Sequence, residues 1–209
     1  MNVLSLFDGM SNGQIALNLN GIKIDKYYAC EIKPHAISVT QENFPNTIQL
    51  GDVKKVKGID LPQIDIVMGG SPCQDFSQAN REKLGLQGTK SGLFYEYVRL
   101  VQETKPKYFF LENVKMNKEA SDIISEELGV QPVLINSKVV CGQLRSRCYW
   151  RKIPLDAIEP KKVLLQDILT EGYTPREKSR CLLESDSRPL ATPIKMFHRY
   201  YNTGFTTLI

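Results

Sequence analysis

The stretch that decides the fold is Leu4-Ser5-Leu6-Phe7-Asp8-Gly9, followed closely by Gly13. An apolar run typical of a buried strand leads here into a tight glycine turn, and a helical pattern begins at Gly13. In a doubly wound sheet, the turn between the first strand and the first helix is where a nucleotide-bearing cofactor lies. Glycine suits such a turn because it accepts a positive φ and lets a ligand approach the backbone.

The rest of the chain repeats this alternation of short apolar runs and longer helical segments. The expected strands cover residues 3–7, 27–30, 48–50, 64–68 and 108–111, and the expected helices cover residues 13–20, 34–43, 92–104, 118–128 and 163–169. Residues 132–136 and 147–152 supply later strands, of antiparallel type because little room is left for a crossover helix. Residues 200–209 are again strand-like. The pattern predicts an α/β fold, a doubly wound and mostly parallel Rossmann-like sheet.

Composition narrows the classes of protein. The chain has 209 residues, 42% of them hydrophobic, and a net charge of +4, which fits a polyanionic partner but also many proteins with none. Five cysteines without a CxxC pair and two histidines argue against a metal site or a disulfide framework. No run of about 18 apolar residues and no basic leader is present, so we expect a soluble, cytoplasmic protein without a membrane span.

The acidic residues indicate which cofactor the turn binds. The spacing is not GxGxxG, and Asp8 would repel a pyrophosphate but suits a cofactor with a cationic amino-acid end, so S-adenosylmethionine is favoured over NAD. Glu31 ends the second strand, where a carboxylate accepts hydrogen bonds from ribose hydroxyls, and Asp52 follows the third strand and could bond the adenine amino group. Taken singly, Asp8 could be an ordinary turn cap and the other two solvated loop carboxylates.

A cysteine follows the fourth strand in Gly70-Ser71-Pro72-Cys73. A thiol on a loop shaped by glycine and proline at the carboxyl edge of the sheet is a candidate nucleophile. The alternative is an inert core cysteine, which the hydrophilic residues after Cys73 disfavour. A zinc deaminase is excluded because a second cysteine would be needed at position 76, which is Phe76.

Two further groups are candidates for handling a base. Glu112 ends the fifth strand at the same edge, where a carboxyl group could engage a ring nitrogen of an electrophile. Arg145 and Arg147 alternate, so we expect them to share a strand face and hold a base carbonyl or phosphates. Taken by itself, this arginine pair is better explained as two exposed side chains without a function.

In this order, the motifs resemble the cytosine-5 DNA methyltransferase family over residues 3–152. Glu112-Asn113-Val114 is similar to its Glu-Asn-Val motif, and residues 143–147 are similar to its Gln-x-Arg-x-Arg motif. The resemblance implies four catalytic residues, which are Cys73, Glu112, Arg145 and Arg147. It implies a binding site for S-adenosyl-L-methionine formed by Phe7, Asp8, Gly9, Gly13, Glu31, Ile32, Asp52, Val53 and Pro72.

The resemblance also implies a mechanism. The Cys73 thiolate adds to C6 of a cytosine that has been swung out of double-stranded DNA, Glu112 engages N3, and C5 becomes able to take a methyl group. Arg147 holds the base O2, Arg145 supports the loop or a phosphate, and residues 74–90 close over the extruded base. No metal takes part.

The chain departs from the family after residue 154. We expect a cofactor-binding and catalytic domain over residues 1–154 and the start of a truncated target-recognition or linker region over residues 155–209. The last family motifs are missing, so a second polypeptide could supply them. An RNA cytosine-5 methyltransferase and a fragment acting as a binding or partner subunit are the alternatives. Restriction-modification, phage protection and regulation all remain open as biological settings.

Overall fold

The computed structural model describes residues 1–72, 92–154, 157–180 and 192–198. The chain divides into two compact units. The first comprises Met1–Leu134 and Cys148–Pro154, and the second comprises Ile135–Arg147 and Leu155–Ile209. Cys73, the loop 74–90 and the expected strand 200–209 lie outside the described residues.

A seven-stranded sheet forms the centre of the fold. Its spatial order is β3 (Ile48–Gln49), β2 (Lys26–Cys30), β1 (Asn2–Leu6), β4 (Ile66–Gly69), β5 (Tyr108–Val114), β8 (Ser146–Arg151) and β6 (Val133–Asn136). The pairs β1·β2, β2·β3, β1·β4 and β4·β5 are all parallel. The predicted mostly parallel α/β sheet is therefore confirmed, and the expected strands differ from the observed ones only at their ends.

The strand order creates a switch point beside β1. The chain runs outward from β1 to β2 and β3, then returns to the other side of β1 with β4. Connections from neighbouring strands leave toward opposite faces of the sheet there, and in doubly wound sheets ligands bind at the carboxyl ends of the strands at such a point. The glycine turn after β1 and the loop that leads to Cys73 therefore start at adjacent places.

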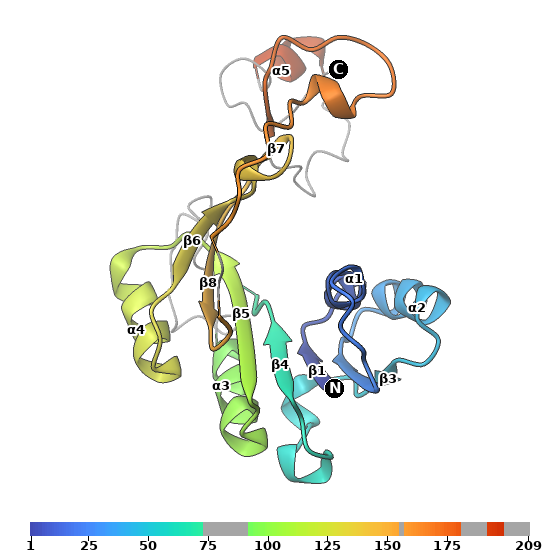
Figure 1. The fold of residues 1–209 in the computed structure, drawn as a ribbon, viewed down its shortest axis with the longest axis vertical. Helices are drawn as coiled ribbons and strands as arrows, with labels where there is room; N and C mark the ends of the chain where they lie inside the picture. The colour runs from blue at the N-terminus through green and yellow to red at the C-terminus, as the bar shows by residue number, and fades with distance from the viewer. Residues whose placement is uncertain (73–91, 155–156, 181–191, 199–209) are drawn as a thin grey trace. The chain divides into compact units, whose positions relative to one another are not determined.

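Helices cover both faces of the sheet (Figure 1), with α1 (Asn12–Leu19) and α2 (Pro34–Asn43) on one side and α3 (Leu93–Thr104) and α4 (Lys118–Leu128) on the other. The sheet has a hydrophobic core on each face, because successive side chains of a strand point to opposite faces. Leu4 and Leu6 pack with residues of α3 and α4, whereas Val3 packs with Leu17 of α1. Local signals set the helix ends: Pro34 starts α2, and Asn117 caps α4 by accepting a hydrogen bond from the Ala120 N–H.

Strand β8 runs opposite to β5, as the spacing predicts. Figure 1 shows the two arrows pointing in opposite directions, and the N–H of Lys152, just after β8, donates to the carbonyl of Phe109 at the start of β5 (3.0 Å). Trp150 of β8 is fully buried, and its indole N–H donates to the Ser125 hydroxyl of α4 at 2.9 Å. This bond joins the late strand to the helical layer.

The second unit contains two short strands, β7 (Gln143–Leu144) and β9 (Ser179–Arg180), which pair in parallel, and α5 (Pro193–His198). The predicted helix over residues 163–169 is wrong, because only a single 3-10 turn forms at Gln166–Ile168. Side chains there bond to the backbone instead: Asp167 accepts from the Leu164 N–H (2.8 Å) and Gln166 accepts from the Thr174 N–H (3.0 Å). Such local bonds compete with a helix.

Candidate functional site

The turn after β1 has a strained backbone. Phe7 and Ser11 both have φ of 58°, and Gly9 between them has φ of 62°. A positive φ is costly for a residue with a side chain, and for a bulky one such as Phe7 it is rare. Among the described residues, the remaining non-glycine case is Lys105, at the end of α3. Strain of this kind persists only where the surroundings enforce it, and it concentrates at functional sites.

Backbone hydrogen bonds hold this turn against the end of β2. The Gly9 N–H donates to Glu31 Oε2 (2.8 Å), and the Asp8 N–H donates to the Cys30 carbonyl (3.0 Å). The other carboxylate oxygen of Glu31 accepts from the N–H groups of Ile32 (2.8 Å) and Lys33 (2.9 Å). Glu31 is therefore fixed at the strand end where the sequence predicts a ribose ligand, and it also ties the cofactor turn to the sheet.

The Asp8 carboxylate is engaged by hydroxyl groups of the protein. Its Oδ1 accepts from the Tyr27 hydroxyl at 2.8 Å, and its Oδ2 accepts from the Ser11 hydroxyl. Burial, followed by the charge of Asp8, raises the pKa of Tyr27 above its ordinary value, so the phenol remains a donor. Asp8 thus stabilises the turn, as its interpretation as a turn cap expects, and it does so through the hydroxyl groups of Tyr27 and Ser11.

Sequence reasoning missed Tyr27 and Thr40. The Thr40 hydroxyl, buried on α2, lies 3.3 Å from the Ser11 hydroxyl and 3.4 Å from the Gly9 carbonyl oxygen. Its spacing of four residues from buried Ala36 was a readable signal, because such residues share a helix face. No local pattern distinguishes Tyr27 from any other strand tyrosine.

The two glycines of the turn serve different purposes. A Cβ on Gly9 would meet no atom within 4 Å, so only its positive φ requires glycine. A Cβ on Gly13 would lie 2.7 Å from Met68 Sδ and 2.9 Å from the Tyr27 hydroxyl. Gly13 therefore allows α1 to pack closely on the sheet, whereas Gly9 shapes the backbone of the turn.

Gly9→Ala should separate backbone strain from steric exclusion. The added methyl group has space, so we expect a loss of roughly 1 kcal/mol in stability from the positive φ alone. Affinity for S-adenosylmethionine, the cofactor predicted from the sequence, should fall by roughly tenfold as the turn relaxes, and isothermal titration calorimetry would measure it. The matched control is Gly21→Ala, because Gly21 has φ of 66° and equal space but follows α1 at the opposite edge of the sheet. Equal cofactor affinity in both variants would contradict the role of Gly9.

Asp52 and Val53 lie in the connection between β3 and β4. Asp52 Oδ1 accepts from the Lys54 N–H at 3.0 Å and begins a 3-10 turn, Val53–Lys55. Val53 is buried in the core, and the apolar side chain of Ile32 is 70% exposed beyond β2.

Cys30, at the end of β2, is also buried. Burial first, and then the charges of Asp8 and Asp52, raise its pKa to about 12, so this thiol stays protonated.

The loop that leads to Cys73 is anchored by β5. A Cβ on Gly70 would lie 3.0 Å from Glu112 Oε2, so the carboxylate rests against the loop backbone. The Asn113 side-chain amide, 1% exposed, donates to the hydroxyl of buried Ser71 at 3.2 Å. Pro72 is half-buried beside them. The fold thus brings Glu112 to the residues immediately before the predicted nucleophile.

Arg145 and Arg147 belong to the second unit. Arg145 lies between β7 and β8, so the two arginines do not alternate along one unbroken strand as expected. The Arg145 N–H donates to Asn136 Oδ1 (3.2 Å) and its carbonyl accepts from the Ser137 N–H (3.0 Å), so the Arg145 backbone is bonded to the end of β6 and the residue after it. Arg147 Nη1 donates to the Ser146 carbonyl at 2.8 Å. A one-residue break at Arg145 between β7 and β8 therefore replaces the single strand expected from the sequence.

The model of the family C-5 cytosine-specific DNA methylase matches residues 1–128. The chain belongs to this family. The match covers the turn after β1, Glu31, the Asp52 turn, the Cys73 loop and Glu112, so the C-5 cytosine-specific DNA methylase fold accounts for the arrangement around the switch point.

Curated relatives of this chain include two orphan methyltransferases of Bacillus phages. M.Rho11sI of phage rho11s is 32% identical over 189 residues, covering 82% of this chain and 37% of the relative, and M.SPRI of phage SPR is 33% identical, covering 82% and 43%. The type II methyltransferase M.NgoBV of Neisseria gonorrhoeae is 36% identical over 116 residues, covering 54% and 27%. The chain spans less than half the length of these relatives.

Solved structures share the fold of this family member. A mutant of DNMT2 from Spodoptera frugiperda has a TM-score of 0.65 at 18% identity, covering 88% of this chain and 70% of that one. A prophage-encoded protein of E. coli, described as a DNA modification methyltransferase, has a TM-score of 0.59 at 24% identity, covering 78% and 51%. The likeness supports the sheet order beyond the residues of the family match.

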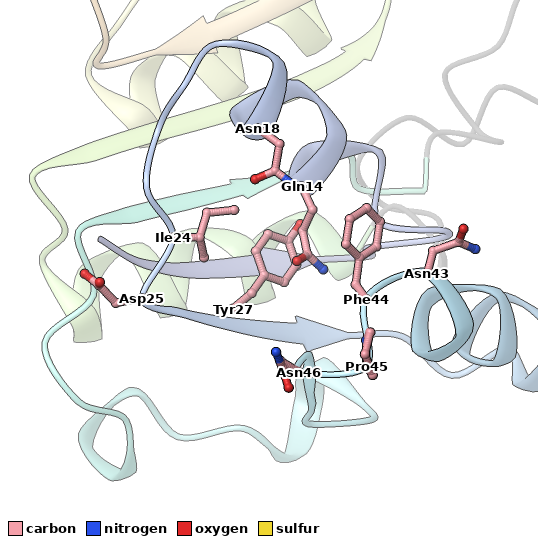
Figure 2. A pocket seen from close by; sticks show the side chains of 9 residues that line it. All are labelled: Gln14, Asn18, Ile24, Asp25, Tyr27, Asn43, Phe44, Pro45 and Asn46. Atoms are coloured by element: carbon pink, nitrogen blue, oxygen red, sulfur yellow. The ribbon is translucent and has the colours of Figure 1, made fainter.

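A separate pocket of about 330 Å³ lies between α1 and the connection from α2 to β3 (Figure 2). It is lined by Gln14, Asn18, Ile24, Asp25, Tyr27, Asn43, Phe44, Pro45 and Asn46. None of the cofactor-binding residues predicted from the sequence lines this pocket. Within the described ranges, no cluster of three His, Cys, Asp or Glu side chains could hold a metal ion. No helix in the part of the chain that the structure describes is long and apolar enough to cross a membrane.

Proposed function

We propose that this chain carries the cofactor-binding and catalytic part of a DNA (cytosine-5)-methyltransferase, which acts on double-stranded DNA in the cytoplasm of a bacterial or phage-infected cell. The observation that supports this most strongly is at the switch point, where the Glu112 carboxyl group lies beside Gly70 and the Asn113 amide donates a hydrogen bond to Ser71. This arrangement brings Glu112, the predicted acid, to the residues that directly precede the predicted nucleophile Cys73. Residues 1–154 form this catalytic part in the proposal, and residues 155–209 begin the target-recognition or linker region.

The residues at the carboxyl edge fit S-adenosylmethionine. Space is open beside the backbone of Gly9 and Gly51, where a Cβ would meet no atom within 4 Å. Glu31 and Asp52 present carboxylates at successive strand ends for ribose hydroxyls and the adenine amino group, and exposed Ile32 offers an apolar surface to the adenine ring. When bound, this cofactor supplies a methyl group on a positively charged sulfur.

In the proposed mechanism, the chain's own residues activate the base. The Cys73 thiolate forms a bond from its sulfur to C6 of cytosine, and the carboxyl group of Glu112 donates its proton to N3, where negative charge would otherwise build up. Electron density then moves to C5, which becomes nucleophilic and is methylated. A base removes the C5 proton, the C5–C6 double bond re-forms, and the Cys73 sulfur leaves.

In this proposal, the two arginines of the catalytic set bind the substrate and take no part in bond making. Arg147 holds the base O2, and Arg145 supports the loop or a phosphate, since a guanidinium suits either acceptor. Because C6 is buried in stacked duplex DNA, the target nucleotide must be extruded at a cost of a few kcal/mol. Residues 74–90, outside the described ranges, would close over it and contact phosphates.

Asn113→Ala tests whether the anchor of the loop matters for the chemistry. Losing this buried hydrogen bond leaves the Ser71 hydroxyl unsatisfied, and we expect stability to fall by about 1–3 kcal/mol. The rate of methyl transfer should fall by roughly tenfold or more, with nearly unchanged cofactor affinity, because the displaced loop carries Cys73. Single-turnover transfer of labelled methyl groups measures the rate.

The control for the anchor is Asn117→Ala. Asn117 caps α4 by accepting a hydrogen bond from the Ala120 N–H of the same helix, and its loss should cost about 1 kcal/mol of stability. We expect normal transfer from Asn117→Ala at a temperature where it is folded. If both variants lose transfer in proportion to stability, Asn113 has no specific role in the loop.

The function itself is tested by trapping. The purified chain is mixed with S-adenosylmethionine and duplex DNA that contains 5-fluorocytosine, whose fluorine cannot leave as a proton does. We expect a protein–DNA adduct that survives denaturation and maps to the peptide containing Cys73. Duplex DNA with ordinary cytosine is the negative control. An adduct formed only with fluorinated RNA would favour the RNA methyltransferase, and no adduct despite bound cofactor would contradict independent catalysis by this chain.

A further inference from the structure

Helix α3 is bonded to the connection that carries Asp52 and Val53. Arg99 Nη2 donates to the Val53 carbonyl at 3.2 Å, and the Gly58 N–H donates to Glu103 Oε2 at 2.6 Å. The partners are 46 and 45 residues apart in the sequence, so neither bond arises from local structure. Two residues of one helix thus hold the β3–β4 connection at two points.

Two carboxylates of α3 hold the Arg99 guanidinium in place beside this connection. Its Nε and Nη2 bond to Glu96 Oε2 at 2.9 and 2.8 Å, and its Nη1 bonds to Glu103 Oε1 at 2.8 Å. Arginine is suited to this task because its planar group presents several donors in a fixed arrangement, whereas lysine offers a single mobile ammonium. The hydrogen bond from Arg99 lowers the pKa of Glu103, so this carboxylate stays ionised.

Close packing makes the second anchor possible. A Cβ on Gly58 would lie 2.5 Å from Cβ of Glu103, so only glycine lets the backbone approach the helix at this distance. Gly58 begins a 3-10 turn, Gly58–Asp60, just as Val53 begins the preceding one. Both turns of the connection are therefore attached to α3 through side chains whose charges are paired with each other.

We propose that Arg99 is a positioning residue for the adenine end of the cofactor site, acting through the Asp52-Val53 turn. The inference rests on the function proposed above. Asp52 uses one carboxylate oxygen to accept the Lys54 N–H, so the direction of the other oxygen depends on how the turn is held. Arg99 bonds the peptide oxygen of the next residue and thereby sets that direction.

The test compares two ligands that differ at the group Asp52 would recognise. S-adenosylhomocysteine carries a 6-amino group on its purine, and S-inosylhomocysteine carries a 6-oxo group that cannot donate to a carboxylate. We expect the wild-type chain to prefer the adenosyl ligand by roughly tenfold. Arg99→Ala should weaken adenosyl binding by roughly tenfold and bring the preference close to one, as Asp52→Ala should by itself. Arg99→Lys should lose most of the preference because it keeps the charge but not the planar group.

The double variant Arg99→Ala/Asp52→Ala separates positioning from general stability. If Arg99 acts through Asp52, the double variant binds S-adenosylhomocysteine no more weakly than Asp52→Ala. Lys118→Ala is the matched control, because it breaks an exposed ion pair with Asp122 on α4 that does not touch the connection. An unchanged preference in both Arg99 variants would overturn the inference while leaving the function intact. Failure of the wild-type chain to bind S-adenosylhomocysteine would overturn both.

Discussion

Cys73→Ser should reduce methyl transfer by at least about a thousandfold, because a serine hydroxyl without an adjacent base is almost entirely protonated and adds poorly to C6. The affinity for S-adenosylmethionine should stay within about twofold of wild type, since the residues proposed to bind the adenosine lie after β1, β2 and β3. Transfer of a labelled methyl group to duplex DNA and calorimetric binding of the cofactor measure the two quantities on the same preparation.

The matched control for this thiol is Cys141→Ser. Cys141 is half-exposed and belongs to the second unit, where its sulfur lies 3.9 Å from the Gln143 carbonyl oxygen. Cys30 and Cys148 are buried and less suitable, because replacing either would disturb packing. We expect full transfer from Cys141→Ser. Surviving transfer in Cys73→Ser would exclude the covalent mechanism, and loss in both variants would indicate damage unrelated to the nucleophile.

Trp150→Ala should cause the largest loss of stability, about 3–5 kcal/mol. The side chain is fully buried on β8 in the core formed with α3 and α4, and its indole N–H is bonded to Ser125. Removing it creates a cavity and leaves the Ser125 hydroxyl without its donor. Because domains are stable by only about 5–15 kcal/mol, this loss removes a large share of the free energy of unfolding.

Urea denaturation followed by circular dichroism would measure this loss, since Trp150 is the chain's single tryptophan and its fluorescence disappears with the substitution. Ser125→Ala is the companion variant. It keeps the indole ring but leaves its N–H unsatisfied, so a smaller loss of about 1–3 kcal/mol is expected. A loss below about 1 kcal/mol for Trp150→Ala would mean that the late strand contributes little to the core.

The sequence by itself determined the elements and the family. Alternation of apolar runs and helical segments depends on neighbours along the chain, so α2 and α4 were predicted to the residue and the parallel strands to within a few residues. The order of the motifs around Asp8, Glu31, Asp52 and Glu112 was sufficient to predict the family that the comparison confirms. At residues 163–169, the apolar pattern predicts a helix that does not form, because Gln166 and Asp167 bond to nearby backbone N–H groups instead.

Only the tertiary structure decided how these elements cooperate. The switch point between β1 and β4 exists because β4 returns to the far side of β1, which no local spacing encodes. The bond from Tyr27 to Asp8 joins separate elements, as does the bond from Arg99 to Val53. Helical spacing could predict the ion pairs of Arg99 with Glu96 and Glu103, but not its contact 46 residues away. Long-range hydrogen bonds depend on how layers pack, and packing is set by the whole core rather than by neighbouring residues.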